Sequence, residues 1–246
     1  FFTMQKKWIV AEVPPPDFFA EHPELPPIAT RLLWNRGLRT AEKIDEFLNP
    51  DYLDDIHDPF LFNDMTKAVG IIGEAIANDK RIVVHGDYDA DGVSAAAILV
   101  TTLKKLGAKN IGVFIPHREN DGYGLNLKTV RLLHDEGTDL IITCDCGISN
   151  TEEIKLAKKL GMSVIVTDHH AMPAVFPPAD AIIHPLVPGE NYPDKTLSGG
   201  GVAFKLATGL LNRHHETHEL LENGEKHEAF EKWLLDMVAI STIADM

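Results

Sequence analysis

The stretch Arg81-Ile-Val-Val-His-Gly-Asp-Tyr-Asp-Ala-Asp-Gly92 decides how this chain is organised. Its apolar start is typical of a buried parallel strand, which we expect over residues 81–85. Asp87, Asp89 and Asp91 then follow at alternate positions, before a glycine that leads into the next helix. Carboxylates this close repel one another unless a cation lies between them, and a hard divalent cation with oxygen ligands is the usual solution. A solvated acidic turn is the alternative that this segment alone leaves open.

Helical and strand patterns alternate from residue 64 onward. The expected strands are rich in Ile and Val and continuous, as in a sheet covered by helices on both faces. We therefore predict an α/β fold with a doubly wound, mainly parallel sheet and helices on both faces. The expected strands are 81–85, 111–115, 138–143, 163–167 and 180–183. The expected helices are 64–79, 92–107, 127–136, 150–160, 202–211 and 227–240.

The first part of the chain differs in composition from the rest. Prolines crowd its beginning, and helical patterns follow over residues 28–37 and 40–48. No residue there carries evident chemistry. We expect a small helical N-terminal annex over residues 1–60, followed by one catalytic domain over residues 61–246.

Composition limits the class of protein. The 246 residues are 44% hydrophobic and 24% charged, as in ordinary globular proteins. No apolar run approaches the roughly 20 residues of a membrane span, and no signal peptide is evident. Cys144 and Cys146 are too close along an extended strand to bridge each other, so we expect reduced thiols and a cytoplasmic protein. The net charge of −14 argues against a broad basic nucleic-acid surface but leaves a narrow basic groove open.

Three expected strands end in residues that bind metals. Strand 81–85 leads to the three aspartates, strand 138–143 to Asp145, and strand 163–167 to Asp168-His169-His170. Parallel strands deliver their carboxyl ends to one edge of the sheet, so these side chains converge. Carboxylates with one or two imidazoles suit Mn²⁺ or Mg²⁺, and their number favours two divalent cations. Two such ions, about 3.5–4 Å apart around a shared water, indicate hydrolysis of a phosphoester or phosphoanhydride.

A second group of residues is suited to binding a nucleotide or phosphate. Arg118 follows the expected strand 111–115 and can hold a phosphate through two N–H groups. Tyr123, between two glycines, can stack on a base or simply pack. Ser198, Gly199 and Gly200 precede a helix, and N–H groups at a helix N-terminus bind anions. Glycine-rich turns also occur without any ligand.

Near the end of the sequence, two aspartates compete for one role. Asp245 follows a short apolar stretch and is a candidate metal ligand, while Asp236 lies inside the expected helix 227–240. Spacing alone does not decide between them.

These motifs together resemble those of a known family. Four of them resemble, in order, the motifs of the DHH phosphoesterases: His85–Gly92, Asp145-Cys-Gly147, Asp168-His-His170 and Ser241-Thr-Ile-Ala-Asp245. Further stretches resemble the RecJ-type, single-strand-specific 5′→3′ DNA exonucleases within that family: Ile115-Pro-His-Arg118, Asp121-Gly-Tyr-Gly124, Ser198–Phe204 and the N-terminal helical region.

The resemblance implies roles for individual residues. It makes metal ligands of Asp89, Asp91, Asp145, His169 and Asp245. Asp145 and Asp245 are then the expected bridges between the ions, and Asp245 is favoured over Asp236. Asp87 becomes a ligand or a partner of the ligands. His170 is expected to contact the scissile phosphate, Arg118 to bind substrate phosphate at the 5′ end, and Asp168 to orient the two histidines.

The resemblance also implies an activity. We expect a metal-dependent phosphodiesterase that hydrolyses single-stranded DNA to nucleotides in DNA repair and recombination, by a two-metal mechanism. The expected partner is single-stranded DNA, with a single-strand-binding protein or a helicase as candidate protein partners, and no membrane. The sequence leaves the oligomeric state open, with a monomer favoured. The alternative is a DHH phosphatase or nanoRNase acting on short oligonucleotides, cyclic dinucleotides or pyrophosphate. An inactive scaffold is a third option, which the intact ligand set disfavours.

The fourth motif lies at the very end of the sequence, where Asp245 is followed by one residue. We therefore expect a fragment that lacks the DHH-associated second domain and the OB fold of RecJ-type proteins. Such a fragment is expected to keep metal binding and to lose processive exonuclease activity.

Overall fold

The computed structural model of the chain describes residues 7–119 and 122–245, and the chain divides into two units, residues 1–56 and 57–246. The division falls near the predicted end of the helical annex, whose standing as a separate domain stays a prediction. In the described part of the chain, no helix is both long and apolar enough to cross a membrane.

The smaller unit consists of three short helices, α1 (Pro16–Glu21), α2 (Pro27–Asn35) and α3 (Ala41–Leu48). The sequence analysis did not expect α1, because it lies among prolines. A proline opens both α1 and α2 in the first turn, where its missing N–H costs nothing. The helices share a small core of Phe18, Leu33 and Ile44.

The larger unit is built on a five-stranded sheet in which all four neighbouring pairs are parallel. Its order is β2-β1-β3-β4-β5. The strands are β1 (Ile82–His85), β2 (Ile111–Phe114), β3 (Leu140–Cys144), β4 (Ser163–Thr167) and β5 (Ala181–Ile183). The predicted α/β fold with a parallel sheet is therefore confirmed.

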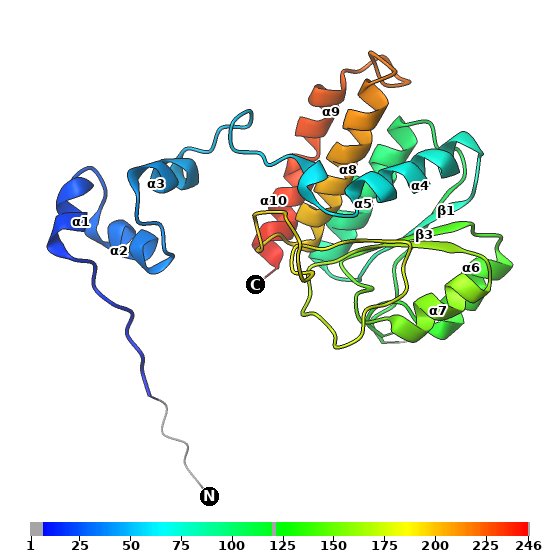
Figure 1. The fold of residues 1–246 in the computed structure, drawn as a ribbon, viewed down its shortest axis with the longest axis horizontal. Helices are drawn as coiled ribbons and strands as arrows, with labels where there is room; N and C mark the ends of the chain where they lie inside the picture. The colour runs from blue at the N-terminus through cyan, green and yellow to red at the C-terminus, as the bar shows by residue number, and fades with distance from the viewer. Residues whose placement is uncertain (1–6, 120–121, 246) are drawn as a thin grey trace, which may run out of the picture. The chain divides into compact units, whose positions relative to one another are not determined.

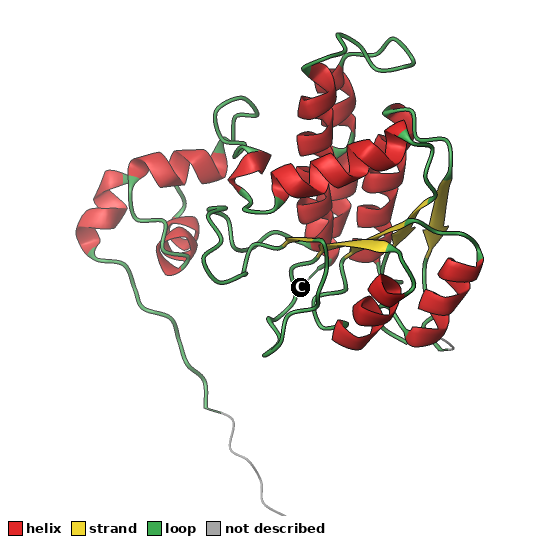
Figure 2. Ribbon diagram, turned by 45° about the vertical axis from the view of Figure 1, so that its right-hand side comes forward, coloured by secondary structure: helices red, strands yellow, loops and turns green. Residues whose placement is uncertain are grey.

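Helices cover both faces of the sheet, as predicted (Figures 1 and 2). One face packs against α4 (Met65–Ala77), α5 (Ala90–Lys105) and α8 (Gly199–His215), whose apolar side chains form the larger core. The opposite face packs against α6 (Leu127–Asp135) and α7 (Thr151–Lys159). The helices α9 (His227–Trp233) and α10 (Leu235–Ala244) join the side of α8, and α10 also contacts α5. A short 3₁₀ turn, η1 (Pro59–Leu61), precedes α4.

Strand register determines where the site forms. His85 pairs with Thr143, and Cys144 pairs with Thr167, so β1, β3 and β4 end at almost the same level. Residues that follow each strand therefore leave the sheet at neighbouring points. This is the edge to which the sequence assigned the metal ligands.

Several predicted boundaries are wrong. The helix expected from residue 92 begins at Ala90, because Asp89 caps it by accepting a 2.9 Å hydrogen bond from the Gly92 N–H. The helix expected from residue 202 begins at Gly199, because Ser198 caps it through the Gly201 N–H. The helix expected over 227–240 is two helices, and neither glycine nor proline marks the break at Leu234.

Candidate active site

The turn after β1 places its aspartates differently from one another. Asp89 caps α5, while Asp91 lies in the first turn of that helix and is only 3% exposed. The Asp91 carboxylate accepts hydrogen bonds from the N–H groups of Gly199 and Gly200, both at 2.7 Å, and from the Ser241 hydroxyl at 2.6 Å. The anion at the N-terminus of α8 is therefore a side chain of the protein itself.

Three residues that were predicted to bind substrate, Ser198, Gly199 and Gly200, lie in the hydrogen-bond network around Asp91. The hydroxyl of Ser198 lies 2.6 Å from that of Ser241, and both belong to the network around Asp91. A substrate phosphate at Gly199 and Gly200 would compete with Asp91 for the same N–H groups. The substrate-binding role of Ser198, Gly199 and Gly200 stays a prediction.

The first two residues of α8 must be glycine, because other side chains lie too close to them for a Cβ atom. A Cβ atom on Gly199 would lie 2.6 Å from both Cβ and Oδ1 of Asp145. A Cβ atom on Gly200 would collide with the hydroxyl of Ser241. The start of α8 thus reaches the ends of β1 and β3 only because these residues have no side chain.

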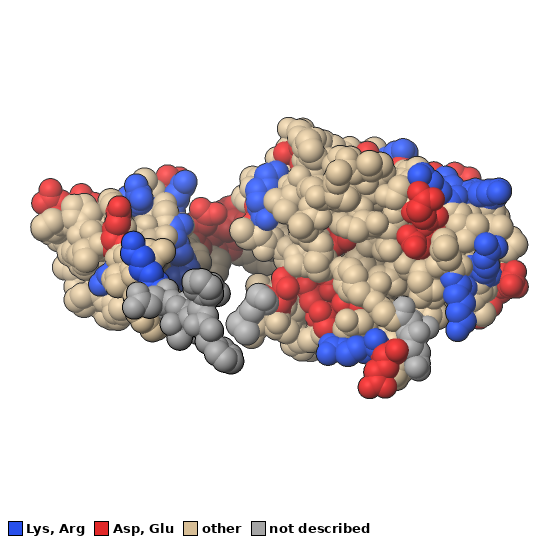
Figure 3. Space-filling view, turned by 90° about the horizontal axis from the view of Figure 1, so that it is seen from below, with Lys and Arg blue, Asp and Glu red and all other residues tan. Residues whose placement is uncertain are grey.

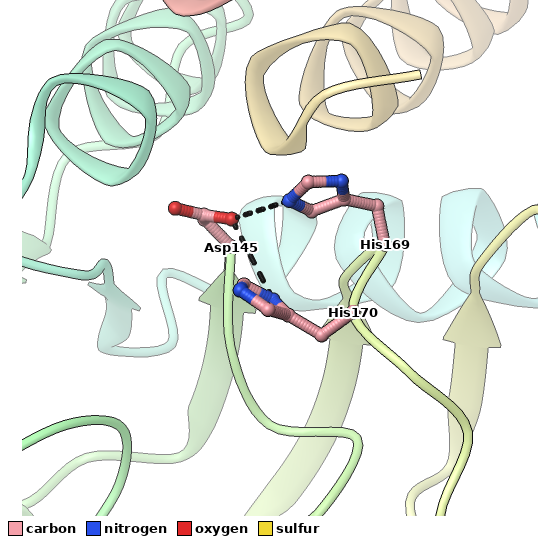
Figure 4. A group of neighbouring side chains, drawn as sticks. All are labelled: Asp145, His169 and His170. Carbon is pink, nitrogen blue, oxygen red and sulfur yellow. Dashed lines mark ion pairs between the residues drawn. The ribbon is translucent and has the colours of Figure 1, made fainter. Parts of the chain in front are cut away.

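Asp145, directly after β3, has an unusual backbone. Its φ angle is +60°, in the left-handed region that non-glycine residues rarely adopt. The side chain is buried, and its Oδ1 lies 3.1 Å from His169 Nε2 and 3.8 Å from His170 Nδ1 (Figure 4). Burial raises the pKa of Asp145 to about 7, which means that the ionised carboxylate is poorly solvated there.

Asp168 holds the residues that follow it on the turn after β4. It accepts hydrogen bonds from the N–H groups of Ile148 and His169, and His170 donates to it from the ring Nδ1 at 2.8 Å. Burial raises the pKa of Asp168, but the hydrogen bonds from His170 and Ile148 outweigh it, so the net pKa is lowered. The same contact with Asp168 raises the pKa of His170 to about 9.

His169 lies between two carboxylates. Its Nε2 faces Asp145, and its Nδ1 lies 3.7 Å from Asp245 Oδ2. Burial lowers the pKa of His169, but the contact with Asp145 outweighs that effect, so the net pKa is raised. The competing candidate, Asp236, is exposed on α10 and takes no part in the acidic groups found among the described residues.

All seven predicted catalytic residues lie in three overlapping groups whose ligand atoms are within 4.8 Å of one another. The groups are Asp87 with Asp89 and Asp145; Asp145 with His169 and His170; and Asp91 with His169 and Asp245. Within the described ranges, Asp87 Oδ1 is buried and has no hydrogen-bond partner, and Asp145 Oδ1 and His169 Nε2 are buried and form a 3.1 Å ion pair without hydrogen-bond geometry. Buried polar atoms without hydrogen bonds, in a site lined mainly by carboxylate oxygens, fit divalent cations such as Mn²⁺ or Mg²⁺.

The two predicted substrate residues of the β2–α6 connection lie near these groups. The guanidinium of Arg118 lies over the ring of Tyr88, 4.5 Å from its centre. Its charge acts on Asp87, whose pKa is raised mainly by burial and lowered slightly by Arg118. The hydroxyl of Tyr123 lies 3.1 Å from His170 Nδ1. Asp121, quoted in the same motif, lies outside the described residues.

Three residues have contacts in this arrangement that the sequence did not indicate. Ser241 stood inside a quoted motif, yet only the fold shows that it binds Asp91, 150 positions earlier in the chain. Tyr88 stood between two predicted ligands with no pattern to distinguish it. Asn150 looked like an ordinary residue at a helix start, although its side chain bonds to Leu125 instead.

Acidic side chains are concentrated on one face of the larger unit. Figure 3 shows a face on which Asp and Glu side chains of the larger unit gather in a patch, with Lys and Arg side chains toward its margin.

Comparison with known proteins identifies the family. Residues 81–242 match the DHH family, N-terminal domain, and the chain belongs to the DHH family. It is 42% identical over 226 residues to the single-stranded-DNA-specific exonuclease RecJ of Bacillus subtilis (strain 168), a match that covers 92% of this chain and 26% of that protein.

Two solved structures are also similar. The fold matches RecJ in complex with Mn²⁺ from Thermus thermophilus with a TM-score of 0.71 and 33% identity, over 97% of this chain and 32% of that one. RecJ in complex with Mg²⁺ from the same organism gives a TM-score of 0.59 and 29% identity, over 97% of this chain and 28% of that one. The chain thus spans between 26% and 32% of the length of these three relatives.

Proposed function

We propose that this chain carries the catalytic centre of a metal-dependent phosphodiesterase that hydrolyses single-stranded DNA from its 5′ end, as a RecJ-type exonuclease. The observation that carries the proposal is the overlap of three candidate metal groups at one edge of the sheet, with Asp145 and His169 each belonging to two of them. The relatives that match most of this chain are named single-stranded-DNA-specific exonucleases, which supports DNA as the substrate class.

In this proposal, the overlapping groups would hold two divalent cations. Asp89, Asp91, Asp145, His169 and Asp245 would be the ligands, and Asp145 would be shared, because its carboxylate belongs to two of the groups. Mn²⁺ and Mg²⁺ are the candidates, since the similar T. thermophilus structures contain them. When bound, the cations lower the pKa of a water molecule and neutralise charge that develops on the phosphate.

The remaining side chains bind and orient the substrate. His170 is held through Nδ1 by Asp168, and its raised pKa of about 9 keeps the ring protonated at neutral pH, so Nε2, which lies 3.3 Å from the Tyr123 hydroxyl, can donate to a phosphate oxygen. Arg118, resting on Tyr88, supplies a guanidinium for the phosphate at the 5′ end. Asp91 is prevented from moving by the N–H groups of α8, so it presents its carboxylate without reorganisation.

The experiment that tests this function is hydrolysis of a 5′-phosphorylated, end-labelled single strand with Mn²⁺ and the chain in excess. We expect mononucleotides to be released from the single strand, while duplex DNA of the same sequence is resistant. Cleavage of a dinucleotide but not of the longer strand would instead assign the chain to the DHH phosphatases and nanoRNases. An Asp145→Asn variant, inactive on every substrate, is the control for contaminating nucleases.

A further inference from the structure

Asn150 occupies the N-cap position of α7 but does not cap it. An asparagine at this position normally accepts a hydrogen bond from an N–H group in the first turn of the helix. Here the side chain makes no such bond. It accepts from the N–H of Leu125 at 3.3 Å and donates to the carbonyl of Leu125 at 2.8 Å. The asparagine therefore binds a residue 25 positions earlier in the chain, and its amide also donates a 3.5 Å bond to the Glu153 carboxylate.

These two hydrogen bonds fix the Gly122-Tyr-Gly124 turn. They engage both the donor and the acceptor of one residue's backbone, as a neighbouring strand would, and so restrain Leu125. Gly124, just before it, has a φ angle of +74°, and a Cβ atom there would lie 2.9 Å from Asn150 Oδ1. The turn rests directly on the asparagine amide, which determines where Tyr123 points.

Tyr123 in turn contacts two groups of the candidate active site. Its hydroxyl donates to the backbone carbonyl of Asp145 at 3.3 Å and lies 3.1 Å from His170 Nδ1. The carbonyl of Asp145 belongs to the residue with the left-handed backbone, at φ +60°. The Tyr123 hydroxyl thus contacts both the left-handed backbone of Asp145 and the His170 ring, which is expected to contact the phosphate.

We propose that Asn150 is a positioning residue of the reaction, acting through Leu125 and Tyr123 on the Asp145 backbone and the His170 ring. The proposal rests on the phosphodiesterase function proposed above. A role confined to α7 would use the same side chain to cap that helix, which it does not do.

The test uses Asn150→Ser, because serine caps a helix well but is too short to reach Leu125. With bis(4-nitrophenyl) phosphate and Mn²⁺, we expect kcat to fall about 10- to 100-fold, with KM almost unchanged. Tyr123→Phe, which removes only the hydroxyl, is expected to have a similar effect. The kcat of the double variant is expected to equal that of the less active single variant, because both changes break the same chain of contacts.

Two further variants distinguish the positioning role of Asn150 from a general loss of stability. Asn78→Ala removes a comparable side-chain bond, to Glu74 at the end of α4, and is expected to leave kcat unchanged. Asn150→Asp keeps the acceptor for the Leu125 N–H and is expected to retain part of the rate, even if the serine variant folds poorly.

A spectroscopic readout does not depend on activity. In protein labelled with ¹⁵N-histidine, the ring signals of His170 are expected to shift alike in Asn150→Ser and Tyr123→Phe, and not in Asn78→Ala. Unchanged His170 signals, or losses of kcat that multiply in the double variant, would overturn the proposal. If the wild-type chain hydrolyses no phosphodiester, the proposed function fails, while the ¹⁵N spectra still decide whether Asn150 positions His170.

Discussion

The two edges of the sheet use the same residue type in opposite ways. At the amino ends of the strands, the carboxylate of Asp139 accepts from the Arg81 N–H, and the Arg81 guanidinium pairs with Glu136 at 2.9 Å. Asp180, just before β5, accepts from the Val164 N–H and pairs with Lys158. Each of these carboxylates has a donor or a basic partner.

At the carboxyl ends, the ion-pair partners of the carboxylates are of another kind. Within the described ranges, the ion pairs of Asp91, Asp145 and Asp245 are with histidine alone, and neither lysine nor arginine takes part. Buried carboxylates without a cation are costly, as the raised pKa of Asp145 indicates. The comparison teaches that the carboxylates at the amino ends stabilise the fold, whereas the buried Asp145 at the carboxyl ends lowers its stability and is retained for chemistry.

The largest expected effect comes from Asp145→Asn. We predict that activity falls by about 10³-fold or more, because the shared ligand is lost. We also predict that the metal-free protein becomes more stable at pH 8, by on the order of 2–4 kcal/mol, since a carboxylate whose pKa is raised to about 7 disfavours folding when ionised. Urea denaturation in EDTA measures this change.

The sign of the pH dependence can be checked in the same experiment. The folded state holds the Asp145 proton up to pH 7 and the unfolded state only to its ordinary pKa of 3.8, so this contribution to stability is lost as the pH rises through about 7. The His170 contribution, present below pH 6.5, is likewise lost as the pH rises through about 9. Wild-type stability that did not fall between pH 5 and pH 8 would contradict this account.

A smaller effect is expected from Gly199→Ala. The added Cβ atom would lie 2.6 Å from Asp145, so α8 must move away and release Asp91. We predict a loss of stability of about 1–3 kcal/mol and weaker Mn²⁺ binding, measured by urea denaturation and calorimetry. The matched control is Gly73→Ala in α4, where no atom lies within 4 Å of the new Cβ. This control is expected to gain about 0.5–1 kcal/mol in stability and to bind Mn²⁺ normally.

The smallest effect is expected from Asp180→Asn, the same substitution at the opposite edge. Its pair with Lys158 is partly exposed, so we predict a loss of only about 1 kcal/mol in stability. Activity and Mn²⁺ affinity are expected to stay at the wild-type level. A gain in stability, as predicted for Asp145→Asn, would erase the distinction between the two edges.

Much of this arrangement could be predicted from the sequence, because it depends on local patterns. Ile/Val runs such as Ile82–His85 indicate buried strands, and the residues after them must meet at one edge. The contacts between distant segments could not be predicted. The bonds from Gly199 and Gly200 to Asp91 join residues more than 100 positions apart, and no spacing rule specifies them. The glycines suggested an anion, but not that the anion is a side chain of the same chain.

Local signals also failed where a side chain serves a distant partner. Asn150 has the residue type of a helix cap, yet it bonds to Leu125. The left-handed backbone of Asp145 has no clear sequence signal either, because aspartate tolerates this conformation but adopts others far more often. Both exceptions lie at the candidate active site, where function rather than local preference determines the conformation.

The central claim is that the carboxyl edge binds two divalent cations that share Asp145. Calorimetric titration of the metal-free chain with Mn²⁺ tests it most directly, with Asp145→Ala measured alongside the wild type. The account predicts two Mn²⁺ ions per wild-type chain and none bound tightly to the variant. A single ion in the wild type, or two ions retained by Asp145→Ala, would contradict it.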